Sequence, residues 1–166
     1  MKVEYEVIFT PKKDRLGQAE EARDVTFTED SRLSSRDEVR QKSRSMAIRN
    51  NILDEYAVRN YWTPACCEMN IIDSPWNNAG ELSDWCQDRF ELNGSPSAES
   101  SWHKESVEIQ FEDTDSRIKA ERELDKLFNG VLPIQSNANM ARVTIRAKAN
   151  INTSNIRQIK KIYELL

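Results

Sequence analysis

The stretch that organises the chain is Val107-Glu108-Ile109-Gln110-Phe111, in which apolar and polar residues alternate. This period-two pattern is typical of a strand with one buried face. Asp113-Thr114-Asp115 follows, with the capping and first-turn acidic residues of a helix start. Apolar residues then recur at helical spacing before a stop at Asn129-Gly130: Ala120, Leu124, Leu127 and Phe128. The stretch predicts a strand followed by a helix.

A second strand and a last helix are predicted beyond this point. Residues 141–148 alternate, with Ala141, Val143, Ile145 and Ala147 against Arg142, Thr144, Arg146 and Lys148. Thr153-Ser154 opens a helical pattern that runs to Leu166. This β-α-β-α order predicts that the two strands are parallel or separated by one strand, with a right-handed crossover.

The N-terminal part predicts two strands and a helix. Alternating apolar residues predict a strand over 2–9, which Pro11 ends, and a short strand over 24–28 that pairs with it across a long loop. Ser35 and Glu38 form a capping box that predicts a long helix running to about Arg59. Its apolar stripe consists of Val39, Met46, Leu53 and Ala57.

Residues 61–103 form an excursion rich in aromatic residues and cysteine. They hold all four tryptophans, all three cysteines and the only histidine: Trp62, Trp76, Trp85, Trp102, Cys66, Cys67, Cys86 and His103. Cys67 to Ile71 alternate as a short strand, and apolar residues between Leu82 and Phe90 have helical spacing. Residues 93–101 are predicted to form a loop.

The alternation in each clear strand predicts a sheet with one buried face and one solvent-exposed, or wet, face. The helices must then lie on one face. We expect an α+β two-layer sandwich with a mixed sheet of roughly four or five strands, ferredoxin-like or a variant, in a single domain spanning 1–166. On the wet face, glutamates should pair across strands with Arg142, Arg146 and Lys148.

Composition and motifs narrow the function classes. No run approaches 18 apolar residues and no signal peptide is recognisable, so we expect a cytoplasmic protein without a membrane partner. Neither type of glycine-rich phosphate loop occurs. Cys66, Cys67, Cys86 and His103 have the atom types of a thiol nucleophile or a zinc site, but their spacing is poor for both. We predict no catalytic residue, metal or cofactor, and a protein that is not an enzyme.

Charge is unevenly distributed along a chain of net charge −4. Residues 32–49 carry six basic and two acidic residues, residues 105–115 carry five acidic and no basic residues, and residues 140–161 carry six basic residues. A basic helix face formed by Arg36, Arg40 and Arg44 follows from their spacing of four. Two basic blocks therefore flank an acidic one.

Protein binding is the leading functional hypothesis. Trp62, Trp76 and Trp102 lie in or beside predicted loops, and tryptophan and arginine are enriched at interface hot spots. We expect an inhibitor, immunity or adaptor type of factor that uses these tryptophans and the basic helix face of Arg36, Arg40 and Arg44. The sequence leaves the partner and the oligomeric state open.

Binding of RNA or DNA is the alternative hypothesis. It would use the basic blocks at 32–49 and 140–161. The residues concerned are Arg36, Arg40, Lys42, Arg44, Arg49, Arg142, Arg146 and Lys148. The acidic pI of about 5.2 and the lack of aromatics on the expected open face argue against it.

Overall fold

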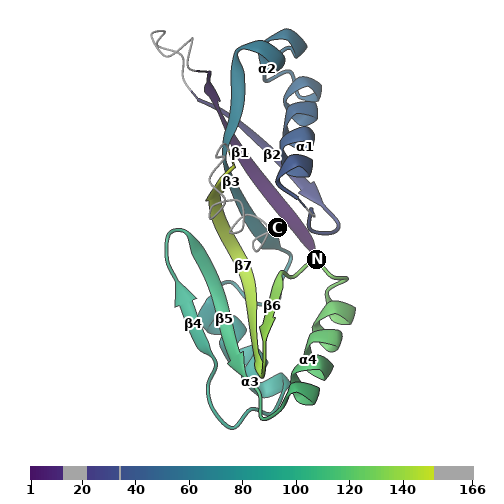
Figure 1. Ribbon diagram of the computed structural model, residues 1–166, viewed down its shortest axis with the longest axis vertical. Coiled ribbons are helices and arrows are strands. Elements are labelled where there is room, and N and C mark those ends of the chain that lie inside the picture. Colours follow the sequence, from purple (N-terminus) through teal and green to yellow (C-terminus); the bar gives the residue numbers. More distant parts are fainter. Residues whose placement is uncertain (13–21, 34, 152–166) are drawn as a thin grey trace.

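The computed structural model of the chain describes residues 1–12, 22–33 and 35–151. Within them, four helices accompany one seven-stranded sheet in which every pairing is antiparallel (Figure 1). The strand order is β2-β1-β3-β7-β5-β4, and β6 also pairs with β7. The α+β class is confirmed, but the sheet has more strands than expected and is not mixed. The helix predicted from Thr153 to Leu166 lies outside the described residues.

The N-terminal half of the sheet is built on β1 (Lys2–Pro11). Strand β2 (Arg23–Glu29) pairs with it from Val3↔Glu29 to Phe9↔Arg23, so the predicted hairpin is confirmed. Strand β3 (Trp62–Ile72) pairs with the other edge of β1. Since β2 and β3 are both antiparallel to β1, they are parallel to each other, and the chain joins them through α1 (Arg36–Arg49) and α2 (Glu55–Asn60).

The predicted long helix is two helices. Ser35 is confirmed as the N-cap, because the Glu38 N–H donates to Ser35 Oγ at 3.2 Å. The helix nevertheless ends at Arg49, and Asn51 adopts a φ of 57°, in the left-handed region that asparagine tolerates. The Asp54 side chain then accepts from the Ala57 N–H at 2.8 Å and begins α2. The prediction of one helix to Arg59 is wrong because the stop signal at Asn50-Asn51 was overlooked.

The C-terminal half contains β5 (Lys104–Gln110), α4 (Thr114–Leu127), β6 (Ile134–Asn137) and β7 (Met140–Asn150). The predicted strands and helix are confirmed, and Asp113 caps α4 by accepting from the Ser116 N–H at 2.7 Å. The expected relation between the strands is wrong, since β5 and β7 are antiparallel neighbours. A two-residue turn at Ala138-Asn139, with Ala138 at a φ of 51°, reverses the chain between β6 and β7.

Helix α3 (Ala79–Arg89) and strand β4 (Ser97–Ser100) complete the fold. The helix matches the predicted apolar spacing. Strand β4 pairs antiparallel with β5 inside a segment that we expected to be a loop. All four β4 residues are exposed, so this strand has no alternating apolar pattern by which it could be recognised.

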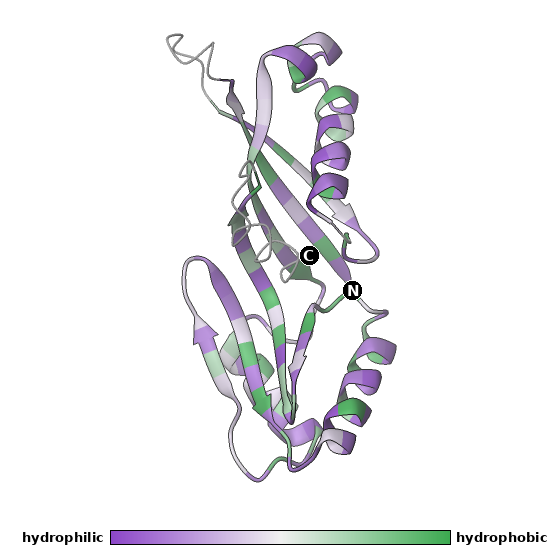
Figure 2. Cartoon of the chain, in the orientation of Figure 1, coloured by the Kyte–Doolittle hydropathy of each residue, from purple (hydrophilic) through white to green (hydrophobic). Residues whose placement is uncertain are grey.

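Two hydrophobic cores lie along the sheet. The N-terminal core gathers side chains of β1, β2, β3, α1 and α2, and the C-terminal core gathers those of α3, β5, α4 and β7. Strand β7 gives Ala141, Val143 and Ile145 to the second core and Ala147 to the first. The register between β5 and β7 shifts between Glu105 and Ser106, so one extra residue of β7, Ile145, interrupts the alternation between the two cores. Figure 2 shows the corresponding alternation of hydrophobic and hydrophilic residues along β5 and β7.

Candidate functional site

The tip of the β4–β5 hairpin presents an exposed tryptophan. Two residues, Trp102 and His103, form the turn between Ser101 and Lys104, whose backbone groups bond to each other at 2.9 and 3.4 Å. Trp102 is 68% exposed, although its ring lies 3.5 Å from that of His103, centroid to centroid. The Lys148 ammonium lies 5.5 Å from the centroid of the indole ring. The tip thus combines a large aromatic surface with a cation–π contact.

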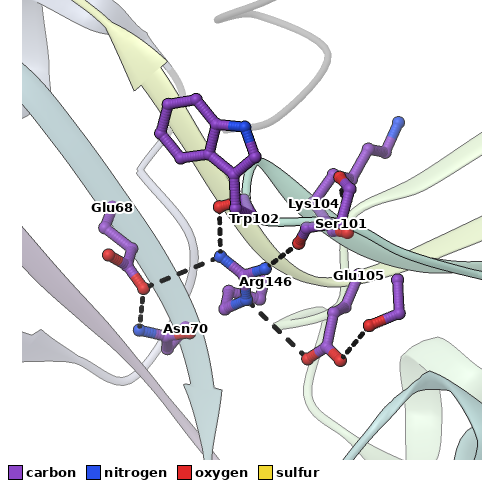
Figure 3. Close-up of polar contacts among 8 residues, drawn as sticks. Glu68, Asn70, Ser101, Trp102, Lys104, Glu105 and Arg146 are labelled. Carbon is purple, nitrogen blue, oxygen red and sulfur yellow. Dashed lines mark hydrogen bonds and ion pairs between the residues drawn. The ribbon is translucent and has the colours of Figure 1, made fainter.

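Arg146 on β7 holds this tip against the sheet (Figure 3). Its guanidinium donates to the carbonyl of Trp102 at 2.9 Å and to the carbonyl of Ser101. The Lys148 N–H donates to the His103 carbonyl at 2.7 Å, so the turn has three hydrogen bonds to β7. These hydrogen bonds to backbone carbonyls fix the orientation of the turn.

Carboxylates surround the same guanidinium on both sides. Glu68 of β3 lies 3.9 Å from Arg146 and Glu105 of β5 lies 3.8 Å from it (Figure 3). Asn70 donates to Glu68 at 3.3 Å and Ser100 donates to Glu105 at 2.9 Å. These contacts join four neighbouring strands of the sheet, β3, β7, β5 and β4.

Cross-strand charge pairing is confirmed at Arg142 as well. Its guanidinium lies 2.9 Å from Glu108 Oε2 on the adjacent strand. Arg142 and Arg146 are about one third and one fifth exposed, respectively, at 32% and 22%. Both arginines have carboxylates as neighbours, so their charge is partly neutralised before any ligand approaches.

The other two tryptophans predicted to contact a partner are buried. Trp62 begins β3 in the N-terminal core, with the Arg23 guanidinium 5.6 Å from its ring centroid. Trp76 belongs to the C-terminal core, where its ring lies 5.2 Å from Trp85 and 5.1 Å from Phe128. Their burial favours a packing role, and contact of either with a partner stays a prediction. Trp102 is the tryptophan that the fold places on the surface.

The basic helix face lies beside the buried stripe of α1. Arg36, Arg40 and Arg44 are all partly buried, and the Nε of Arg40 is buried without a hydrogen-bond partner among the described residues. Burial and the neighbouring charge of Arg40 lower the pKa of the Arg44 guanidinium. Lys42 is 3.0 Å from Glu29 of β2, and Arg49 is exposed in the last turn of the helix. Figure 1 shows that α1, which carries this face, lies apart from the β4–β5 hairpin that carries Trp102.

The cysteines have the properties of structural thiols. Cys66 and Cys67 lie on β3 and Cys86 on α3, whereas His103 lies in the hairpin turn. Burial raises the pKa of all three thiols, that of Cys86 to about 12. Since the thiolate is the nucleophile and metal ligand, these groups are poorly suited to either role. Among the residues that the structure describes, no three or more His, Cys, Asp or Glu gather where they could hold a metal ion.

Comparisons with protein-family models, curated proteins and solved structures found no match. Within the described ranges, no helix has the length and apolar character needed to cross a membrane.

Sequence reasoning identified Trp102, but it overlooked the turn that carries it. Two-residue hairpin turns are recognised by Asn-Gly or Asp-Gly, and Trp102-His103 has neither signature. The role of Arg146 as a donor to backbone carbonyls was equally invisible, because these partners lie 44 and 45 residues away along the chain. The one sequence signal for this site was an aromatic residue followed by a histidine and a lysine, Trp102-His103-Lys104.

Proposed function

We propose that the protein is a non-enzymatic protein-binding factor, of the inhibitor, immunity or adaptor type, which contacts its partner through Trp102. The observation that carries the proposal is a 68% exposed indole at the end of a hairpin. Exposing so large an apolar ring to water is unfavourable, and tryptophan is the residue most enriched at interface hot spots.

Preorganisation of the turn supports this proposal. Three hydrogen bonds from Arg146 and the Lys148 N–H already fix the backbone on either side of the indole. Few further rotatable bonds of the turn would therefore lose their freedom when a partner binds, which lowers the entropic cost of association. Lys148 and Lys104 near the turn suit a partner whose apolar pocket has an acidic rim.

Replacement of Trp102 by alanine tests the proposal in a pull-down from nuclease-treated native lysate with quantitative mass spectrometry. Proteins retained by the native chain should be lost with Trp102→Ala, because the hot-spot ring is absent. Tyr56→Ala removes another exposed aromatic, 64% exposed, on α2 and should retain them. Equal recovery by all three proteins would disprove a role for Trp102.

Nucleic-acid binding is a second candidate, favoured by the exposed indole and by Arg40 and Arg44. Neither arginine has a carboxylate partner in the described part of the chain, and an exposed indole can stack on a base. The carboxylate neighbours of Arg142 and Arg146 argue against a phosphate-binding sheet face. A labelled oligonucleotide should shift at low salt and be released steeply as salt increases, and Arg40→Glu with Arg44→Glu should abolish the shift. Without a shift at low salt, this candidate fails.

A further inference from the structure

A groove runs between the free edge of β2 and helix α1. It has a volume of about 630 Å³, within the range of ligand sites. Its lining consists of Thr26, Phe27, Thr28, Glu29, Lys42, Ser45, Met46 and Arg49. Figure 1 shows α1 alongside β2, at one margin of the sheet.

The spacing of the lining residues defines the shape of this groove. Four consecutive residues of β2 line it, although alternate side chains of a strand point to opposite faces. The groove must therefore follow the backbone edge of the strand as well as one of its faces. The helix contributes positions 42, 45, 46 and 49, which form one stripe of α1. One strand edge and one helix stripe thus make its two walls.

Strand β2 is an outer strand of the sheet. It pairs with β1 on one edge, and no backbone hydrogen bond of the described residues engages the other. Alternate residues of an antiparallel strand direct their N–H and C=O groups away from the partner strand. The centre of β2, Thr26-Phe27-Thr28, contains neither charge nor proline, the usual means of blocking an edge. The opposite outer strand, β4, is only four residues long and carries Glu99.

We propose that this groove binds an extended acidic peptide of a partner protein, which adds a strand to the edge of β2. Main-chain hydrogen bonds to β2 would supply affinity, as in other cases of strand addition. The partly buried Met46 offers an apolar floor for a side chain of the peptide.

Charge on the helix wall selects an acidic peptide. Arg49 is exposed and has no carboxylate within ion-pair distance among the described residues. Lys42 lies 3.0 Å from Glu29 and has a half-exposed side chain, so it can still face a second carboxylate. With Lys42 and Arg49 against Glu29, the groove has an excess of positive charge. This site does not depend on the Trp102 turn, and the two can be tested separately.

A labelled peptide of alternating valine and glutamate, Val-Glu-Val-Glu-Val-Glu-Val, is the probe for fluorescence anisotropy. It should bind the full chain saturably, and the matched Val-Lys-Val-Lys-Val-Lys-Val peptide should bind at least about tenfold more weakly because of like charge. Hydrogen exchange in the presence of the acidic probe should slow at β2 amides and leave β4 amides unchanged.

Two substitutions at exposed helix positions locate the binding. Arg49→Glu should weaken the acidic probe by about tenfold or more, because it replaces an attractive charge with a repulsive one. Ser45→Trp should abolish binding by filling the groove. Arg122→Glu makes the same charge change on an exposed position of α4 and should leave affinity unchanged, as should Trp102→Ala.

Three results would overturn the proposal. They are the absence of saturable binding, equal affinity for the lysine peptide, and an Arg49→Glu variant that binds like the native chain. Sedimentation of the peptide-free protein examines the competing occupant, a second copy of this chain. A concentration-dependent dimer that Ser45→Trp abolishes would assign the groove to self-association instead.

Discussion

The N-terminal and C-terminal halves of the sheet have the same three-strand layout and opposite chain orders. In each, two parallel strands flank an antiparallel one and are joined through helices. In the N-terminal half the middle strand is β1, which comes first in the sequence. In the C-terminal half the middle strand is β7, which comes last. Alternation of residues therefore decides which face of a strand is buried, whereas the order of strands along the chain does not decide which of them are neighbours.

The two halves are stabilised differently. The N-terminal core contains a buried polar contact, because the Tyr5 hydroxyl accepts from the Leu33 N–H at 2.8 Å while its ring stacks on Phe27 at 5.4 Å. The C-terminal core contains an aromatic cluster centred on Trp76. Strand β7 contributes to both cores, so we expect the halves to unfold together as one domain.

Trp76→Ala should have the largest effect on the stability of the domain that the two halves form. It empties a site among packed aromatic rings and should lower the free energy of unfolding by about 3–5 kcal/mol. Denaturant unfolding followed by circular dichroism measures the change, and Trp102→Ala, at an exposed position, should stay within about 0.5 kcal/mol of the native chain. Two separate transitions would show that the halves are independent.

Alkaline pH should weaken both halves through their buried thiols, Cys67 and Cys86. Burial raises the pKa of both in the folded chain, that of Cys86 to about 12, above the ordinary thiol pKa of about 8.5. The unfolded chain loses these protons first, so stability is fully present below about pH 8.5 and falls as pH rises towards the folded values. Between pH 7.5 and 9.5 the loss should be about 1 kcal/mol for each thiol.

Stability curves at several pH values provide the measurement for the thiols. A variant carrying Cys67→Ala and Cys86→Ala should have a flatter dependence on pH than the native chain, whatever its absolute stability. If the two slopes agree, the thiols are not the groups responsible.

Tyr5→Phe should affect the N-terminal half by a smaller amount. It leaves the ring in place but removes the acceptor of the buried Leu33 N–H, at a cost of about 1–3 kcal/mol. Tyr56→Phe removes a hydroxyl from an exposed ring and serves as the matched control, with an expected change below about 0.5 kcal/mol. A Tyr5→Phe protein as stable as this control would show that the Leu33 contact is dispensable.

Arg146→Met should have the smallest effect on stability, about 1 kcal/mol, because the side chain is partly exposed and its ion pairs are long. Its local effect should be larger, since two carbonyls of the Trp102 turn lose their donor. Hydrogen exchange of the Lys148 amide should accelerate in Arg146→Met more than in Arg142→Met, which breaks a single cross-strand pair. Equal exchange in the two variants would mean that Arg146 does not hold the turn.

Local sequence signals predicted most elements that carry an alternating or helical apolar pattern. Strands β1, β2, β5 and β7, both caps at Ser35 and Asp113, and helices α3 and α4 all follow from residues that are near one another in the chain. Strands β4 and β6 were not predicted from the sequence because they are short and neither has a clear apolar alternation. Of the candidate site, the sequence predicted Trp102 as a contact residue, but not the turn that carries it or the bonds from Arg146.

The sequence by itself determined the α+β class and which residues of each alternating strand are buried. Each of these depends on periodicity, which neighbouring residues alone define. Only the tertiary structure decided that β7 lies between β5 and β3, that Trp62 and Trp76 are buried while Trp102 is exposed, and that β2 has a free edge beside α1. These features depend on contacts between residues far apart in the chain, and local periodicity carries no information about such contacts.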